Sequence, residues 1–221
     1  YGTDGAIWGC ECLIASLREF ERFGHLAYYP LAGGDRASAE AIRPLLGLLA
    51  EQDIRDIESL LIKIEPDGRK IDTIRTQLDR QVNTVPTSSL GRFFDAAAAL
   101  AGLGAVNSYE AQLPMALEAI ADEQEEGTYP VQIESDSGGV CLWRPGPVIA
   151  EMMEDRKRKT DAALMAARFH NTVAAALLAF ALTNPYALAA FPAFWHNVAG
   201  QAALARGVLD APYTRQFHGA W

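Results

Sequence analysis

A run without charged side chains, from Asn171 to His196, is the feature that most restricts how this chain can fold. Its length would allow a transmembrane helix, because about 20 apolar residues span a bilayer. However, the run consists mainly of alanine and is interrupted by Asn184-Pro185 and by Pro192. Proline breaks a helix, and alanine contributes little to membrane insertion. The run therefore favours a buried helix, a turn and a buried strand, and we expect no membrane association.

Charge and cysteine content exclude other classes of protein. The chain carries 19 basic and 28 acidic residues, a net charge of −9, which argues against a nucleic-acid-binding surface. Half of the residues are apolar, as in an ordinary globular protein. Cys10, Cys12 and Cys141 are too few, and odd in number, for a disulfide framework. We therefore expect a reducing, cytoplasmic location.

Hydrophobic periodicity predicts a helix-rich α/β fold. Alternation predicts two strands within residues 6–32, closed by a turn at Gly33-Gly34-Asp35, and a hairpin formed by 129–134 and 140–143. Helical patterns cover 37–49, 53–64, 71–82, 90–103, a segment from Pro114 to about 122, and 158–182. The first of these helices should kink at Pro44, and the last should bury Leu164, Ala167, Leu178 and Phe180.

The segment from Thr87 to Asp95 is the most informative candidate site. Its serines predict an N-cap, and Gly91 in the first helical turn would expose backbone N–H groups. A carboxylate one turn later, at Asp95, can accept two hydrogen bonds from ribose hydroxyls. On the pattern alone, an acid stabilised by the helix dipole is the simpler interpretation.

Three further patterns are weak signals. Gly2-Thr3-Asp4-Gly5 allows either a loop that approaches phosphate or a plain turn. Cys10-Glu11-Cys12 has metal-like spacing, but no further Cys or His follows at zinc spacing, so we expect no metal site. His170 and Asn171 lie within a predicted helix, where a buried polar pair is the simpler interpretation.

Taken together, several runs resemble the carbamoyltransferase domain of HypF-type hydrogenase maturation proteins, which is related to the TsaD/Gcp tRNA-modification proteins. They occur in the family's order over most of the chain. The most specific are Tyr1–Gly9 and Ser88–Asp95. The supporting runs are Pro30–Asp35, Asn83–Thr87, Tyr109–Gln112 and Ala167–Thr172.

This resemblance implies one lobe of an actin-like ATPase fold, of ribonuclease H-like type. It implies a chemistry in which ATP and carbamoyl phosphate give a carbamoyl-adenylate. The carbamoyl group then passes to the C-terminal cysteine thiolate of a HypE-type acceptor protein. The full-length family also uses a divalent metal.

The resemblance also assigns roles to particular residues. Asp95 would hold the ribose, Asp4 would be catalytic, and the others would contact the nucleotide or its phosphates. We therefore expect the Gly91 backbone and the Asp95 carboxylate to face one solvent-accessible cleft, beside Tyr109–Ala111. The nucleotide-binding set is Gly2, Gly5, Gly91, Asp95, Glu110, Ala111 and Asn197.

The chain departs from the family's pattern in several places. The family's metal-binding histidines and first lobe are absent, as is its late Asp-Gly-Gly motif, so we expect one partial domain over 1–221. In the second nucleotide loop, Phe191–Asn197, only the asparagine is kept, and Ala111 stands where the family has glycine. We therefore expect little or no activity from this chain alone. A non-catalytic binding or structural remnant and a small-molecule O-carbamoyltransferase are the alternatives.

Overall fold

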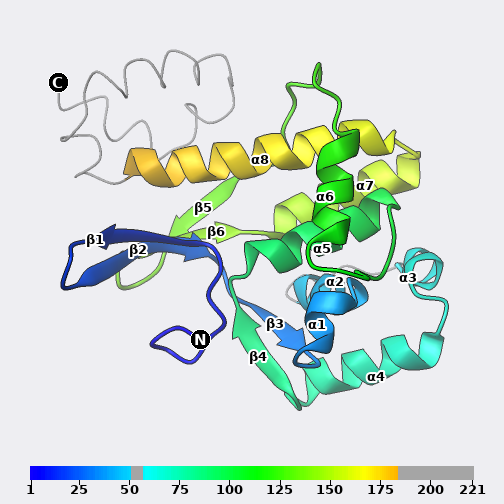
Figure 1. Cartoon of the computed structure of the whole chain (residues 1–221), viewed down its shortest axis with the longest axis horizontal. Helices are drawn as coiled ribbons and strands as arrows, with labels where there is room; N and C mark the ends of the chain where they lie inside the picture. Colours follow the sequence, from blue (N-terminus) through cyan, green and yellow to red (C-terminus); the bar gives the residue numbers. More distant parts are fainter. Residues whose placement is uncertain (51–56, 184–221) are drawn as a thin grey trace.

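Two sheets and a set of packed helices form the fold (Figure 1). The computed structural model describes residues 1–50 and 57–183. The strands are β1 (Glu11–Ala15), β2 (Phe20–Leu26), β3 (Tyr29–Ala32), β4 (Thr84–Thr87), β5 (Gln132–Ser135) and β6 (Cys141–Arg144). The helices are α1 (Arg36–Ala39), α2 (Ile42–Ala50), α3 (Glu58–Ile64), α4 (Gly68–Asp79), α5 (Leu90–Ala101), α6 (Gln112–Ile120), α7 (Gly146–Arg158) and α8 (Ala162–Thr183). The predicted helix-rich α/β class is confirmed.

The larger sheet has the strand order β1-β2-β6-β5. Strand β2 pairs antiparallel with β1 and parallel with β6, and β5 pairs antiparallel with β6. The smaller sheet pairs β3 with β4 antiparallel, with Tyr29 opposite Thr87. Residues 6–32 thus contain three strands and not the two predicted, because the chain turns between Leu26 and Tyr29 and changes sheets. The predicted 129–144 hairpin is confirmed.

Helix α5 is the centre of the core. It packs against α2, α6, α7 and α8, and every residue from Asp95 to Ala101 is buried. Phe93 meets Phe169 of α8 edge to face at 5.0 Å, and its ring lies 5.7 Å from that of Trp143 in β6. The alanines of α5 allow its neighbours to approach closely, while the aromatic rings fill the remaining space.

The prediction of one helix over 37–49, kinked at Pro44, is wrong. The chain forms two helices, α1 and α2, and Glu40 between them is extended and pairs with Val106. Pro44 is the third residue of α2, in the first turn, where its missing N–H removes no helical hydrogen bond. The helix predicted at 53–64 is described only from Glu58, because 51–56 lie outside the described residues.

Helix α7 was not predicted, and the helix predicted at 158–182 begins only at Ala162. Two local signals mark these boundaries. Pro147 lies in the first turn of α7, and Asp161 accepts a hydrogen bond from Ala163 N at the start of α8. Between the helices, Lys159 has φ +60° and so ends α7.

The buried face of α8 differs in part from the prediction. Ala167 and Phe180 are buried, but Leu164 and Leu178 are only half-buried. The buried stripe runs along Met165, Phe169, Val173, Ala176 and Phe180, which repeat at helical spacing.

Helix α8 is also long and apolar enough to cross a membrane by length and composition. Half of its most apolar window is buried against the rest of the described chain. The expectation of no membrane association stays a prediction. The strand expected beyond residue 183 falls outside the described residues.

Candidate functional site

The opening loop of the chain lies against the segment that leads into α5. Ile7 N donates to Pro86 O at 2.9 Å, and Ser88 N donates back to Ile7 O at 3.0 Å. The Thr87 hydroxyl donates to the same carbonyl, also at 3.0 Å. The two most specific sequence motifs, about 80 residues apart in the chain, are therefore brought together at one end of α5.

The Asp4 carboxylate is the centre of this opening loop. It accepts hydrogen bonds from Tyr28 Oη at 2.5 Å, Trp8 Nε1 at 2.9 Å, Arg22 at 3.0 Å and Ala6 N at 3.1 Å. The Arg22 guanidinium also stacks 4.3 Å from the centre of the Trp8 ring. These hydrogen bonds, led by that from Tyr28, hold the pKa of Asp4 well below its usual range.

A carboxylate in this state stays ionised at neutral pH and has its oxygens engaged. It can fix the loop and contribute negative charge, and its lowered pKa makes it a weak base near pH 7. The catalytic role of Asp4 stays a prediction; its observed contacts are those of a residue that fixes the opening loop.

Both glycines of the loop are needed by the loop itself. Gly5 N donates to Gly2 O at 3.1 Å, and Gly5 has φ +81°, which favours glycine. A Cβ on Gly2 would lie 2.1 Å from the Trp8 indole. The closed turn accounts for the glycine pattern without a ligand, so phosphate contact by Gly2 and Gly5 stays a prediction.

Glu11 is a residue that the sequence did not single out for this site. Its carboxylate accepts hydrogen bonds from Cys10 N at 2.9 Å and from the hydroxyl of Ser88, which is fully buried. On the other side, Tyr29 Oη donates to Ser89 O at 2.8 Å. Together these contacts fix the residues immediately before α5. No local pattern predicts them, because they join strands β1 and β3 to a segment about 60 to 77 residues later.

The start of α5 confirms the predicted N-cap. Ser89 Oγ accepts a hydrogen bond from Arg92 N at 3.3 Å. Gly91, in the first turn, is exposed, and the nearest atom to a Cβ added there would be Ser89 Oγ at 3.9 Å. Packing therefore does not require glycine at this position, and Gly91 itself is open to solvent. On either side of it, Leu90 N donates to Gly9 O at 3.5 Å and Arg92 N is taken by the Ser89 cap.

Asp95, in contrast, does not lie where the sequence analysis predicts. We expected its carboxylate to face a solvent-accessible cleft, but the residue is 0 % exposed. Oδ1 accepts a hydrogen bond from Asn107 Nδ2 at 2.8 Å, and Arg92 Nε lies 3.0 Å from Oδ2 without the alignment of a hydrogen bond. Burial raises the pKa of Asp95, against the opposing effects of Asn107 and Arg92.

The expectation of an accessible Asp95 is thus wrong, and the reason is the position of α5. Because helices surround α5 on all sides, its second turn faces protein and not solvent. A ribose could reach this carboxylate only after Arg92 or Asn107 had moved away.

Asn107 connects Asp95 to the turn before α6. Its Nδ2 also donates to Ser38 O at 3.0 Å, and its Oδ1 accepts from Leu113 N at 2.8 Å. The intervening turn contains the predicted adenosine contacts Glu110, which is exposed, and Ala111, which has φ +60°. The structure therefore links this turn to α5 through Asn107. The remaining predicted residue, Asn197, lies outside the described residues.

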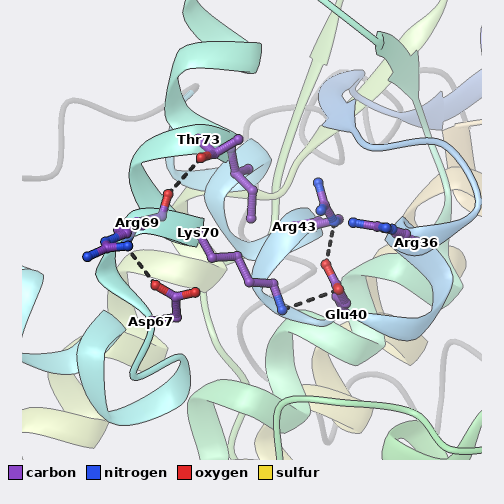
Figure 2. A pocket seen from close by; sticks show the side chains of 8 residues that line it. Arg36, Glu40, Arg43, Asp67, Arg69, Lys70 and Thr73 are labelled. Atoms are coloured by element: carbon purple, nitrogen blue, oxygen red, sulfur yellow. Dashed lines mark hydrogen bonds and ion pairs between the residues drawn. The ribbon is translucent and has the colours of Figure 1, made fainter.

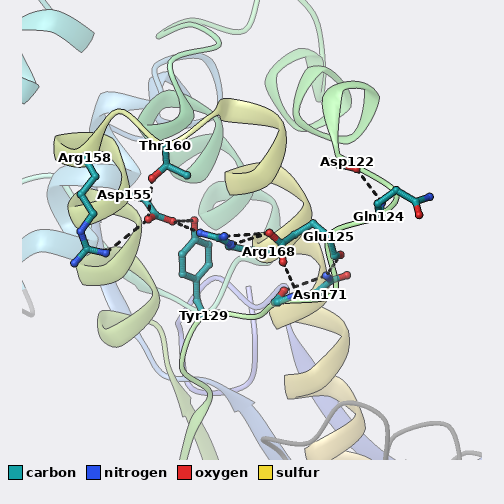
Figure 3. A network of polar contacts seen from close by, with 10 residues as sticks. Asp122, Gln124, Glu125, Tyr129, Asp155, Arg158, Thr160, Arg168 and Asn171 are labelled. Carbon is teal, nitrogen blue, oxygen red and sulfur yellow. Dashed lines mark hydrogen bonds and ion pairs between the residues drawn. The ribbon is translucent and has the colours of Figure 1, made fainter.

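The run Ala167–Thr172 has a structural role (Figure 3). Arg168 of α8 pairs with Asp155 of α7 at 3.1 Å and with Glu125 at 3.0 Å. Asn171 Nδ2 donates to Glu125 O at 2.8 Å. These contacts hold the segment after α6 against α7 and α8.

Within residues 1–50 and 57–183, no three His, Cys, Asp or Glu side chains lie close enough together to hold a metal ion. The residues described thus offer no ligand set for the divalent metal that the resemblance implies. Burial raises the pKa of Cys10 and of Cys12 to about 11, so both thiols are protonated at neutral pH.

Comparison with known proteins places these motifs in a family. The model of the carbamoyltransferase Kae1-like domain, second subdomain, matches residues 1–187. The carbamoyltransferase HypF homolog of Cupriavidus necator is 35% identical over 188 residues, covering 81% of this chain and 47% of the relative. HypF of Rhizobium leguminosarum bv. viciae is 38% identical over 120 residues, covering 54% of this chain and 15% of the relative.

Two crystal structures have similar folds. Full-length HypF in a phosphate- and nucleotide-bound form gives a TM-score of 0.72 at 36% identity, covering 81% of this chain and 23% of that chain. HypF from T. kodakarensis gives 0.70 at 29% identity, covering 88% of this chain and 25% of that chain. The chain thus spans about half or less of the length of these relatives.

Proposed function

This chain belongs to the HypF-type carbamoyltransferase family, within its Kae1-like domain, and we propose that it supplies the nucleotide-binding part of an ATP-dependent carbamoyl transfer. In the proposed reaction, a carbamoyl-adenylate is the donor. A cysteine thiolate of a HypE-type acceptor attacks the carbamoyl carbon, the bond from that carbon to the AMP phosphate oxygen breaks, and AMP leaves. The names of the relatives support the reaction class, and the nucleotide-bound HypF structure supports a nucleotide site.

The observation that carries this proposal is the junction of the opening loop with the first turn of α5. A helix N-terminus presents free N–H groups and a positive dipole end, which suit a phosphate. At this terminus Gly91 is exposed, while Glu11 and Tyr29 hold the preceding residues in place. Leu90 N and Arg92 N are already paired, so the proposal rests on the exposed backbone of Gly91, held in place by its neighbours.

For the adenosine, we propose the turn at Tyr109–Ala111. Tyr109 and Glu110 are exposed there, and Asn107 fixes the turn to α5. In this proposal the buried Asp95 accepts the hydrogen bond from Asn107 that positions the turn, and it does not contact the ribose directly in the described conformation.

A direct test is calorimetric titration of the 221-residue chain with ATP and ADP. Gly91→Ala adds one methyl group where the structure has space, so the fold should be kept while phosphate approach is blocked. We expect at least about a tenfold loss of affinity, the equivalent of one charge-assisted hydrogen bond. Gly68→Ala is the matched control, because Gly68 lies in the first turn of α4 and an added Cβ there is also unobstructed.

The alternatives give different results. A structural remnant would bind no nucleotide even at millimolar ATP, and this outcome would overturn the proposal. Equal affinities of the wild type and Gly91→Ala would show that binding occurs elsewhere. Transfer of a labelled carbamoyl group to a small-molecule hydroxyl, and not to a protein thiol, would favour the O-carbamoyltransferase alternative.

A further inference from the structure

A basic pocket of about 310 Å³ opens between α1, the start of α2 and the start of α4 (Figure 2). Four of the side chains that line it are cationic, and two are carboxylates. The cations are Arg36, Arg43, Arg69 and Lys70, and the acids are Glu40 and Asp67. No lining residue belongs to the nucleotide site proposed above, so this pocket does not depend on that proposal.

Glu40 orients two of the cations. Its Oε2 lies 2.6 Å from Arg43 Nε, and its Oε1 lies 3.2 Å from Lys70 Nζ. Lys70 also pairs with Glu65 at 2.7 Å. Arg43 is only 6 % exposed, and its Nη1 donates long hydrogen bonds to Gln77 Oε1 at 3.4 Å and Ala32 O at 3.5 Å. Its guanidinium is thus fixed at the wall of the pocket with little solvation from water. One carboxylate thus fixes two cations that face the same space.

In the part of the chain that the structure describes, the side chains of Arg36 and Arg69 form no ion pair; Asp67 accepts from the backbone N of Arg69 at 3.0 Å. Arg36 is exposed, and Figure 2 shows its guanidinium pointing toward that of Arg43. Arg69 is also exposed at the rim of the pocket. Cations that line one pocket repel one another unless an anion or water screens them.

Helix geometry adds to the positive potential. Arg43 lies in the first turn of α2, which has nine residues, and Arg69 and Lys70 lie in the first turn of α4, which has twelve. The pocket is therefore lined from the positive ends of two helices in addition to four cationic side chains.

We propose that this basic pocket binds a phosphate group, held by Arg36, Arg43 and Lys70. The paired donors of a guanidinium match the oxygens of a phosphate, and the ammonium of Lys70 adds a point charge. The ligand class is a small molecule with a terminal phosphate dianion, such as inorganic phosphate, pyrophosphate or a phosphate monoester.

The test is titration of the full 221-residue chain with inorganic phosphate and then with pyrophosphate, followed by ³¹P NMR at constant ionic strength. We expect saturable binding that Arg36→Gln weakens at least about tenfold. Arg36 is exposed and lies outside the core, so this variant should fold like the wild type. Arg75→Gln is the control, because Arg75 lies further along α4, pairs with Glu58 at 2.5 Å and does not line the pocket.

Gly91→Ala separates this site from the nucleotide site. If the proposal holds, the phosphate binding that Arg36→Gln weakens is kept in Gly91→Ala. No saturation in the millimolar range would overturn the proposal, as would equal affinities of the wild type and Arg36→Gln. Loss of binding in Gly91→Ala alone would also overturn it, because the phosphate would then occupy the start of α5.

Discussion

Asn107 Nδ2 donates a hydrogen bond of 2.8 Å to the fully buried carboxylate of Asp95. The same asparagine accepts from Leu113 N, so one side chain joins the second turn of α5 to the start of α6. Asp95 is therefore a structural anchor for the Tyr109–Ala111 turn. Replacing Asp95 should therefore lower the stability of the fold, and any change in ligand affinity should be a consequence of that loss.

We expect Asp95→Ala to lower the free energy of unfolding by about 2–4 kcal/mol, because it leaves Asn107 and Arg92 without their buried partner. Asp95→Asn keeps the shape and an acceptor for Asn107 while it removes the buried charge, so its loss should be clearly smaller. Urea unfolding of both variants at pH 7 measures the difference. Equal losses would show that the charge, and not the hydrogen bond, is what matters.

The pH dependence of stability should also differ between the wild type and Asp95→Asn. Burial raises the pKa of Asp95, so the folded state binds its proton more tightly than the unfolded state does. The contribution of Asp95 to the free energy of unfolding should therefore be greatest below the unfolded pKa of about 3.9 and should decline as the pH rises through the folded pKa. Unfolding curves of the two proteins, subtracted at each pH, isolate this trend. A difference that is flat or rises with pH would contradict it.

Asp4 should show the opposite behaviour. Its pKa is lowered in the folded state, so its stabilising contacts are present above the unfolded value of about 3.9 and are lost only as the pH falls well below that value. The indole N–H of Trp8, which donates to Asp4 at 2.9 Å, reports on this ionisation. Its ¹H–¹⁵N resonance should stay constant through pH 4, where ordinary carboxylates titrate. A titration midpoint near 4 would contradict the hydrogen-bonded arrangement.

Arg168 offers a test of the network in Figure 3. Arg168→Ala should lower the free energy of unfolding by about 1–3 kcal/mol and should make the chain near Glu125 sensitive to limited proteolysis, since it removes two ion pairs of 3.0 and 3.1 Å. The control is Arg158→Ala, because Arg158 is largely exposed and lies 4.0 Å from the same Asp155. The control should change stability by less than about 0.5 kcal/mol. Similar effects in the two variants would show that the network is not specific to Arg168.

Local signals predicted much of the fold. The Ser89 N-cap, the helix that follows it and the 129–144 hairpin are all set by a few neighbouring residues, and each is confirmed. In the same way, Pro147 and Asp161 are local signals that could have revealed α7 and the true start of α8. The residues that set these boundaries are therefore local in the sequence.

The candidate site was harder to predict, because its contacts join distant segments. No local pattern places Arg22 on Trp8, or Glu11 on Ser88, 77 residues away. The burial of Asp95 lies between these cases, because local sequence indicates the burial but not the partners. Arg92 and Asp95 are the only charged residues of α5, and the rest of the helix beyond Arg92 is apolar on all sides. A helix of this kind is usually buried on all sides. That pattern was visible in the sequence and argued against an accessible carboxylate.

Ala111 provides the last prediction, because it occupies the left-handed region with φ +60° just before α6. A Cβ in this conformation costs about 1–2 kcal/mol, whereas glycine adopts it freely. Glycine also gives the unfolded chain more conformational entropy, and this offsets part of the stability gained when the strain at residue 111 is removed. We therefore expect Ala111→Gly to raise the free energy of unfolding by about 0.5–1 kcal/mol.

The matched control is Ala116→Gly in the middle of α6, where glycine should lower stability by about 1 kcal/mol because helical φ and ψ give it no advantage. Urea unfolding of the two variants should thus give shifts of opposite sign. If the Tyr109–Ala111 turn also contacts adenosine, the methyl group of Ala111 would crowd it. The ATP affinity of Ala111→Gly should then rise, whereas that of Ala116→Gly should not. A loss of stability in Ala111→Gly comparable to the loss in Ala116→Gly would show that residue 111 is not held in the left-handed conformation in solution.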